Sequence, residues 1–329
     1  MKVINTTVQA ITEKEGGEDA LRPLTFCDYI GQQRVKKMVE VAVKSAKARC
    51  TSLDHILFYG PPGLGKTTIA NIVANEMGAD ISVLVGGNIE KTGDIAAVLC
   101  RMKPNDILFI DEIHRLPKPC EEMLYSAMED GFVTLMVGEG QQAKSIKMNL
   151  EPFTLLGATT ELGSISAPLR DRFSLECKME YYSEDELSLI VQNNAKKMDY
   201  DLSYDNALMI AKASRETPRI AIRLLKQIRD FAYAENCGDI DKDVIEKTFH
   251  LHGIRKDGID DADIEILNAL AKGKVMGLTT LAHIIGEDIG TIEKAKEPFL
   301  LRKQYIEKTP RGRTLTEKGY AYLGIKKEE

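Results

Sequence analysis

The chain has 329 residues, 43% of them hydrophobic, and a net charge of −6 from 44 basic and 50 acidic side chains. This length predicts two or three domains with sizeable cores, and the composition excludes disordered, collagen-like and fibrous proteins. The overall acidity argues against a chain coated in basic charge for nucleic acid, but it leaves room for a local basic patch.

No run of 18 apolar residues occurs, so no transmembrane helix is expected, and the first twenty residues lack the order of a secretory signal. Six scattered cysteines without a CxxC pair favour reduced thiols over a disulfide framework or a zinc site. Together these features predict a cytoplasmic protein.

The first part of the chain alternates short apolar runs with helical patterns. Residues 1–20 are polar and predict a flexible arm. The elements expected next are helix 35–49, strand 55–59, helix 67–77, strand 81–85, strand 107–110 and strand 153–156. This alternation predicts an α/β domain over 21–181, with a parallel sheet and helices on both faces.

Strand patterns stop near Tyr181, and a capping box at 183–186 opens a run of helical patterns. We expect a small all-helical domain over 182–255. The rest of the chain, 256–329, begins with a linker and three short helical stretches up to residue 302. Two short arms around the Pro310-Arg311-Gly312 turn then complete a predicted winged helix.

A phosphate-binding loop follows the first predicted strand and matches G-x-x-x-x-G-K-[ST]. Its residues are Gly60, Pro61, Pro62, Gly63, Leu64, Gly65, Lys66 and Thr67. Glycines let backbone N–H groups surround phosphates, and the following helix start favours negative charge. Lys66 is expected to neutralise the β- and γ-phosphates, and the Thr67 hydroxyl to bind Mg²⁺.

Two further strands end in polar residues that suit the same site. Asp111 and Glu112 follow the apolar run at 107–110, where Asp111 can hold Mg²⁺ and Glu112 can orient or deprotonate water. Thr159 and Thr160 end the next strand and can bond the γ-phosphate or the water. The alternatives are an acidic helix cap and an ordinary strand-end turn.

Arginines suited to a phosphoryl-transfer transition state occur at two places. Arg170 and Arg172 lie just beyond the strand at 153–156, and Arg219 opens a helix of the predicted small domain. A surface ion pair is the alternative for each.

These elements together resemble the AAA+ ATPases, and more closely the RuvB family of bacterial motors for Holliday-junction branch migration. The resemblance covers residues 21–324 and is most specific in LFIDEIHRL (108–116), PLRDRF (168–173) and TPRGR (309–313). It departs at Glu216, Ser126 and Glu161, where the family commonly has Gly, Pro and Arg, and none of these is a catalytic group.

The resemblance implies a role for each candidate. Lys66, Thr67 and Thr68 would bind ATP or ADP with Mg²⁺. Asp111 and Glu112 would form the Walker B pair, Thr159 and Thr160 sensor 1, and Arg219 sensor 2. Arg172 would be the arginine finger that reaches a neighbouring subunit, with Arg170 as the second candidate. The adenine pocket would be formed by Arg22, Tyr29, Ile30, Tyr182 and Pro218. A finger acting between subunits implies a ring, and the family forms homo-hexamers around duplex DNA.

The charge of the chain is unevenly distributed. Residues 299–329 contain eight basic and four acidic side chains, a net charge of +4. Because the whole chain has a net charge of −6, residues 1–298 have a net charge of −10. The densest basic point is the wing turn with Arg311 and Arg313, near Lys308, which predicts sequence-independent phosphate contacts. An ordinary solvated basic terminus is the alternative.

Residues 132–150 read as a hairpin with apolar Ile146 and Met148 on one arm. If their face is exposed, it predicts a docking surface. In the family this hairpin docks on RuvA, the junction-recognition protein. The alternative is that both faces are core.

The leading interpretation is an ATP-driven DNA motor that moves Holliday junctions with a RuvA-like partner. A clamp-loader or initiator-like ATPase is the second possibility. The third is a nucleotide-gated winged-helix regulator without turnover, against which the Asp111-Glu112 pair argues.

Overall fold

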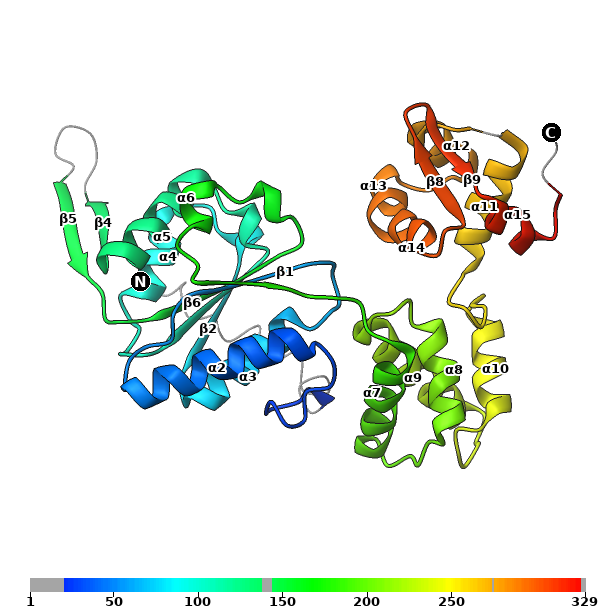
Figure 1. Ribbon diagram of the computed structural model, residues 1–329, viewed down its shortest axis with the longest axis horizontal. Helices are drawn as coiled ribbons and strands as arrows, with labels where there is room; N and C mark the ends of the chain where they lie inside the picture. Colours follow the sequence, from blue (N-terminus) through cyan, green and yellow to red (C-terminus); the bar gives the residue numbers. More distant parts are fainter. Residues whose placement is uncertain (1–20, 138–143, 274, 327–329) are drawn as a thin grey trace. The chain divides into compact units, whose positions relative to one another are not determined.

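The computed structural model describes residues 21–137, 144–273 and 275–326 (Figure 1). The arm predicted at 1–20 lies outside the described residues. The chain divides into two compact units. The first runs to Ile190 and includes Thr217–Arg219, and the second comprises the remainder. Within the described ranges no helix is long and apolar enough to cross a membrane.

A five-stranded parallel sheet forms the first unit, with strand order β2-β3-β6-β1-β7. Its strands are β1 (Ile56–Tyr59), β2 (Ile81–Val85), β3 (Ile107–Asp111), β6 (Thr154–Thr159) and β7 (Leu175–Lys178). The sequence predicts the first four. β7 lacks the apolar signal of a central strand because it pairs only with β1, at the sheet edge, and has one buried residue.

Helices cover both faces of this sheet, as predicted (Figure 1). One face carries α2 (Gln33–Arg49) and α3 (Lys66–Met77), and the other carries α4 (Thr92–Leu99) and α5 (Lys118–Asp130). The short elements between them are η2 (Gly86–Asn88), η3 (Ile113–Arg115), η5 (Leu162–Ser164) and α6 (Ala167–Arg170).

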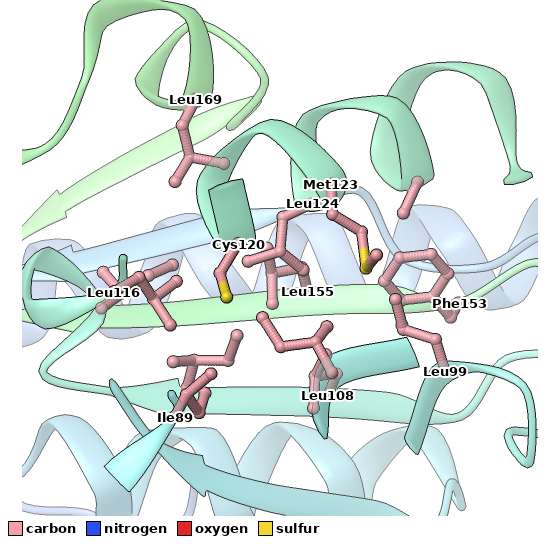
Figure 2. Close-up of a cluster of buried hydrophobic side chains, with 14 of the residues drawn as sticks. Ile89, Leu99, Leu108, Leu116, Cys120, Met123, Leu124, Phe153, Leu155 and Leu169 are labelled. Atoms are coloured by element: carbon pink, nitrogen blue, oxygen red, sulfur yellow. The ribbon is translucent and has the colours of Figure 1, made fainter. Parts of the chain in front are cut away.

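The core beneath α4 and α5 holds the central strands in place. Figure 2 shows Leu108 of β3 and Leu155 of β6 directed at Cys120 and Leu124 of α5, and all four are fully buried. Burying one such leucine side chain stabilises the fold by about 1.5–3 kcal/mol. The carboxyl ends of β3 and β6 are therefore held side by side.

A separate antiparallel hairpin lies between α5 and β6 in the chain and forms a two-stranded sheet of its own. β4 (Phe132–Val137) pairs with β5 (Lys144–Asn149), and the predicted hairpin over 132–150 is therefore observed except at residues 138–143, which are not described.

Beyond the sheet the chain becomes helical, as predicted. The helices are α7 (Glu184–Lys197), α8 (Tyr204–Ala213), α9 (Pro218–Ala234) and α10 (Lys242–Leu251). Ser203 and Asp241 cap α8 and α10 by accepting a backbone N–H with their side chains, which satisfies a donor that helix starts leave unpaired.

The C-terminal part combines helices with a two-stranded wing, as the sequence predicts. Its elements are α11 (Asp261–Gly273), α12 (Leu278–Ile285), α13 (Ile289–Thr291), the π-helical η6 (Ile292–Lys296), α14 (Glu297–Arg302), β8 (Ile306–Thr309), β9 (Gly312–Leu315) and α15 (Glu317–Leu323). Pro298 in the first turn of α14 has no N–H to donate to the preceding turn, which suits the irregular π segment before it.

Candidate nucleotide site

Three neighbouring strands bring the predicted polar residues to one edge of the sheet. β6 lies between β3 and β1, with Ile110 opposite Gly157 and Tyr59 opposite Thr159. Because the strands are parallel, the phosphate loop after β1, the acidic pair at the end of β3 and the threonines at the end of β6 share the carboxyl edge, where ligands bind in open α/β sheets.

The phosphate loop connects β1 to α3 through backbone that favours glycine. Gly63 and Gly65 have φ values of 81° and 94°, and Gly65 is the N-cap of α3. Lys66 begins the helix, and its Nζ donates to the carbonyl oxygens of Gly60 at 2.8 Å and Pro61 at 2.9 Å. Burial lowers the pKa of Lys66, an effect that nearby Asp111 opposes. Thr67 and Thr68 are half-buried in the same turn.

The acidic pair is held by an unusual backbone conformation. Glu112 has φ 50°, a left-handed value that costs a non-glycine residue energy and is found at functional sites. Its N–H donates to Asp111 Oδ1 at 2.9 Å, and its Oε2 accepts from the Thr160 hydroxyl at 3.3 Å. A Cβ on Gly86 would collide with the Glu112 carbonyl oxygen, so only glycine allows this approach.

The oxygen atoms at this edge fit a magnesium ion shared with a ligand. The described residues contain no group of three or more His, Cys, Asp or Glu side chains that could hold a metal. Mg²⁺ in phosphate sites uses one or two protein oxygens and completes its shell with phosphate oxygens and water. The Asp111 carboxylate and the Thr67 hydroxyl are donors of this kind.

The two candidate finger arginines have different partners within the chain. Arg170 forms a bidentate pair with Glu176 of β7, with both contacts at 2.7 Å, and hydrogen bonding to Arg170 lowers the pKa of that carboxyl. Arg172 pairs with Glu129, donates to Tyr125 Oη at 2.8 Å and lies 4.5 Å from the Tyr125 ring centroid. The Nε of Arg172 is buried and makes no hydrogen bond with any of the described residues.

The residues proposed for the adenine pocket differ in burial. The Tyr182 hydroxyl lies 3.2 Å from that of Tyr29 and 3.3 Å from Leu64 O, and burial raises the pKa of Tyr182 to about 12. Both rings are buried, so they support the loop. Arg22, Ile30 and Pro218 are only half-buried.

Arg219, in the first turn of α9, lies beside the phosphate loop. Its backbone N–H donates to Gly63 O at 3.4 Å. The residue is exposed.

The two arginines predicted at the wing, Arg311 and Arg313, differ in burial. Arg311 is exposed, but Arg313 is buried and bonds Glu297 at 2.7 and 2.9 Å. Lys308 pairs with the same carboxylate at 3.4 Å while staying half-exposed. The expectation that Arg313 contacts DNA is therefore corrected: its guanidinium is occupied in the winged-helix core, because a buried glutamate requires a cation.

On the hairpin, Ile146 and Met148 of β5 are 45% and 37% exposed. They stand opposite Leu135 and Val133 of β4, of which Val133 is fully buried. The alternative in which both faces of the hairpin are core does not hold for these two side chains.

An ionic cluster in the second unit was not predicted. We call it the Asp263 cluster: Arg215 bonds Asp260 at 2.7 Å and the fully buried Asp263 at 2.5 Å, and Lys296 bonds Asp260 at 2.5 Å. Next to it, Glu216 pairs with Arg302 and Lys303 at 2.8 and 2.7 Å, and both cations lie in or just after α14. Glu216, which departs from the family pattern, therefore forms ion pairs with two cations of the winged-helix part. Since Arg302 and Lys303 are paired in this way, the basic surface is smaller than the charge count suggests.

Sequence reasoning also missed His114, which lies 3.4 Å from Glu112 and 3.0 Å from Thr159. The missed residues had weak signals: His114 lies two residues after Glu112, and Asp260, Asp263 and Glu216 look like ordinary solvated charges. Their partners come from distant parts of the chain.

Comparison with known proteins covers nearly the whole chain. Residues 21–179 match the model of the Holliday junction DNA helicase RuvB P-loop domain, 182–255 the RuvB AAA lid domain, and 256–324 the RuvB C-terminal winged helix domain.

Individual relatives agree. The RuvB subunit of the Holliday junction branch migration complex from Campylobacter hominis is 49% identical over 311 residues, which cover 94% of this chain and 92% of that protein. The Fusobacterium nucleatum subunit is 46% identical over 309 residues, with 93% of each chain covered. The structure of the Thermotoga maritima RuvB Holliday junction branch migration motor has a TM-score of 0.82 at 42% identity and covers 93% of this chain and 99% of its own. The chain belongs to the RuvB family, and its nucleotide-binding domain is a P-loop ATPase domain of that family.

Proposed function

We propose that this chain is an ATP-driven motor that moves Holliday junctions during recombination and DNA repair. The observation that carries the proposal is the meeting of the phosphate loop, the Asp111-Glu112 pair and the Thr159-Thr160 pair at one sheet edge of a RuvB-family chain. Winged-helix elements on the same polypeptide supply a means to hold DNA.

In the proposed reaction, Glu112 takes a proton from water as the water oxygen bonds to the γ-phosphorus of ATP. The bond from that phosphorus to the β–γ bridging oxygen breaks, leaving ADP and inorganic phosphate. Lys66 neutralises phosphate charge and Thr159 or Thr160 orients the γ-phosphate. Asp111 and Thr67 would hold Mg²⁺, which supplies further charge neutralisation when bound.

Arg172 is the finger that we propose for the neighbouring subunit's γ-phosphate, and Arg219 is the sensor of nucleotide state. Arg170 is the second candidate because its Nε and one terminal nitrogen already bond the two carboxylate oxygens of Glu176. Arg172 contacts Glu129 and Tyr125 through one terminal nitrogen, and its Nε makes no hydrogen bond to any residue that the structure describes. A finger acting between subunits requires a ring, which we propose to be a homo-hexamer.

The surfaces for partners are proposed from exposure. Arg311 and Lys308 at the wing would contact duplex phosphates without reading sequence. Ile146 and Met148 would dock a RuvA-like junction-binding protein. We further propose the domain limits 21–181, 182–255 and 256–329, and a cytoplasmic location suited to DNA work.

The decisive experiment is ATP-dependent branch migration of a synthetic four-way junction, with and without a RuvA-type protein. Wild-type chain should move the junction, while Glu112→Gln should bind ATP without moving it. Full DNA-stimulated ATPase activity in Glu112→Gln would contradict the mechanism. ATP turnover without junction movement would favour a clamp-loader or initiator-like ATPase, and DNA binding without any turnover would favour a regulator.

A further inference from the structure

One side chain at the nucleotide site has no role in the proposed reaction. His114 belongs to η3, two residues after Glu112, and its imidazole is 9% exposed. Its Nε2 lies 3.4 Å from Glu112 Oε2, and its Nδ1 lies 3.0 Å from Thr159 Oγ1. The ring therefore connects the end of β3 to the end of β6.

Hydrogen bonding to Thr159 determines which nitrogen of the His114 ring carries the proton. Thr159 is fully buried, and its Oγ1 already accepts the Glu161 N–H at 2.9 Å. In the described part of the chain, His114 Nδ1 is the acceptor in reach of the Thr159 hydroxyl proton. A neutral imidazole has one donor and one acceptor nitrogen, so accepting at Nδ1 places the proton on Nε2. The protonated Nε2 then lies 3.4 Å from Glu112 Oε2, and the Glu112 carboxylate can only accept.

Glu112 is thereby restrained from three sides. Its backbone is fixed in the left-handed region against Gly86. Its Oε2 accepts from Thr160 on one strand end and faces His114 Nε2 on the other. A general base must be held within hydrogen-bond reach of its proton, and a third group commonly orients it.

We propose that His114 is a positioning residue for ATP hydrolysis: held in its Nε2–H form by Thr159, it orients the Glu112 carboxylate toward the attacking water. The proposal rests on the proposed function, in which Glu112 is the base. His114 touches no reacting atom and is not itself a catalytic residue.

Two amide substitutions separate this role from simple packing. The amide of His114→Gln reaches the place of Nε2 and keeps an N–H donor beside Glu112. The amide of His114→Asn reaches only the place of Nδ1 and keeps the bond to Thr159. If His114 merely supports Thr159, the asparagine variant should be the more active of the two.

The test is steady-state ATPase activity of the full-length chain with duplex DNA, together with fluorescent-nucleotide binding. We expect kcat of His114→Gln to stay within about 10-fold of wild type, while His114→Asn and His114→Ala lose on the order of 10²-fold in kcat with unchanged KM. An asparagine variant as active as the glutamine variant, or a loss confined to KM, would overturn the proposal.

A double variant shows whether His114 acts through Glu112. In the Glu112→Gln background, adding His114→Ala should cost no further activity, because residues that act as one unit are not additive. A further loss would sink the proposal. Failure of the proposed function looks different: Glu112→Gln alone would then keep wild-type ATPase activity.

Discussion

The nucleotide site and the Asp263 cluster use charged side chains in opposite ways. At the nucleotide site, Lys66 bonds backbone carbonyls and Asp111 accepts a backbone N–H, so their charges are left to a ligand. In the Asp263 cluster, Arg215 and Lys296 form ion pairs with two carboxylates, one of which is fully buried.

The difference lies in what removing one charge leaves behind. A charge held ready for a ligand can be removed with little loss of stability but a large loss of chemistry. A charge that neutralises a buried partner leaves that partner in a low dielectric medium, which costs several kcal/mol. Three pairs of variants and one comparison of a variant with wild type test this contrast.

The largest effect is expected at the finger. Arg172→Ala should lower the steady-state ATPase rate by about 10³-fold or more, because an arginine finger stabilises charge in the transition state. The matched control is Arg170→Ala, whose guanidinium is engaged by Glu176, and it should lose far less. Mixing Arg172→Ala with Lys66→Ala subunits should restore part of the activity. No recovery at any ratio would contradict action between subunits.

Removing Arg215 should mainly affect stability. Arg215→Ala leaves Asp260 and Asp263 with less positive charge, and we expect the free energy of unfolding to fall by about 3–5 kcal/mol. Arg229→Ala is the control, because its pair with the neighbouring Asp230 is partly exposed and should be worth less than about 1 kcal/mol. Calorimetry measures both. Equal losses of unfolding free energy in the two variants would contradict the expected difference between a buried and a partly exposed ion pair.

Arg311 and Arg313 repeat the contrast two residues apart. Arg311→Ala should leave the melting temperature unchanged and reduce the salt dependence of DNA binding, log K against log[salt], by about 1. Arg313→Ala should instead lower the melting temperature, because Glu297 then keeps Lys308, a half-exposed cation at 3.4 Å, in place of two closer bonds to Arg313. A melting temperature unchanged in Arg313→Ala would show that this buried pair contributes nothing net.

The smallest effect is a pH dependence from Asp263. Burial raises its pKa to about 6, above the unfolded value of about 3.9, so the folded state holds the extra proton between these values. Stability from this group is therefore present at low pH and declines as pH rises through 6. Between pH 5 and 7 we expect a loss of about 1 kcal/mol that is absent in Asp263→Asn.

The pH window of 5 to 7 isolates this group from its neighbours. Burial opposes ionisation of Asp260, but Lys296 and the Asp263 N–H hold the pKa of Asp260 below its usual value. Glu216 likewise has a lowered pKa, since Lys303 and Arg302 outweigh its burial. The stabilisation that these two carboxyls contribute to the fold is therefore lost only at lower pH. Identical pH profiles of wild type and Asp263→Asn would contradict the assignment.

Local sequence determined the parts of this protein whose signals span a few residues. Apolar runs of four or five residues located β1, β2, β3 and β6, and the glycine-rich loop located the phosphate site. The parallel arrangement followed from their alternation with helices, and so did the expectation that Asp111, Glu112 and Thr159 share an edge. Such features depend on backbone propensity and burial, which neighbouring residues decide.

Tertiary structure alone decided the partners of charged residues. Arg313 and Arg311 look equally basic in the sequence, yet only Arg311 is exposed. His114 reaches Thr159 across 45 residues of chain, and Arg215 reaches Asp263 across 48. A charge or an imidazole is solvated or paired according to which distant group the fold brings within about 3 Å. That distance is set by packing of the whole domain, so no local pattern carries it.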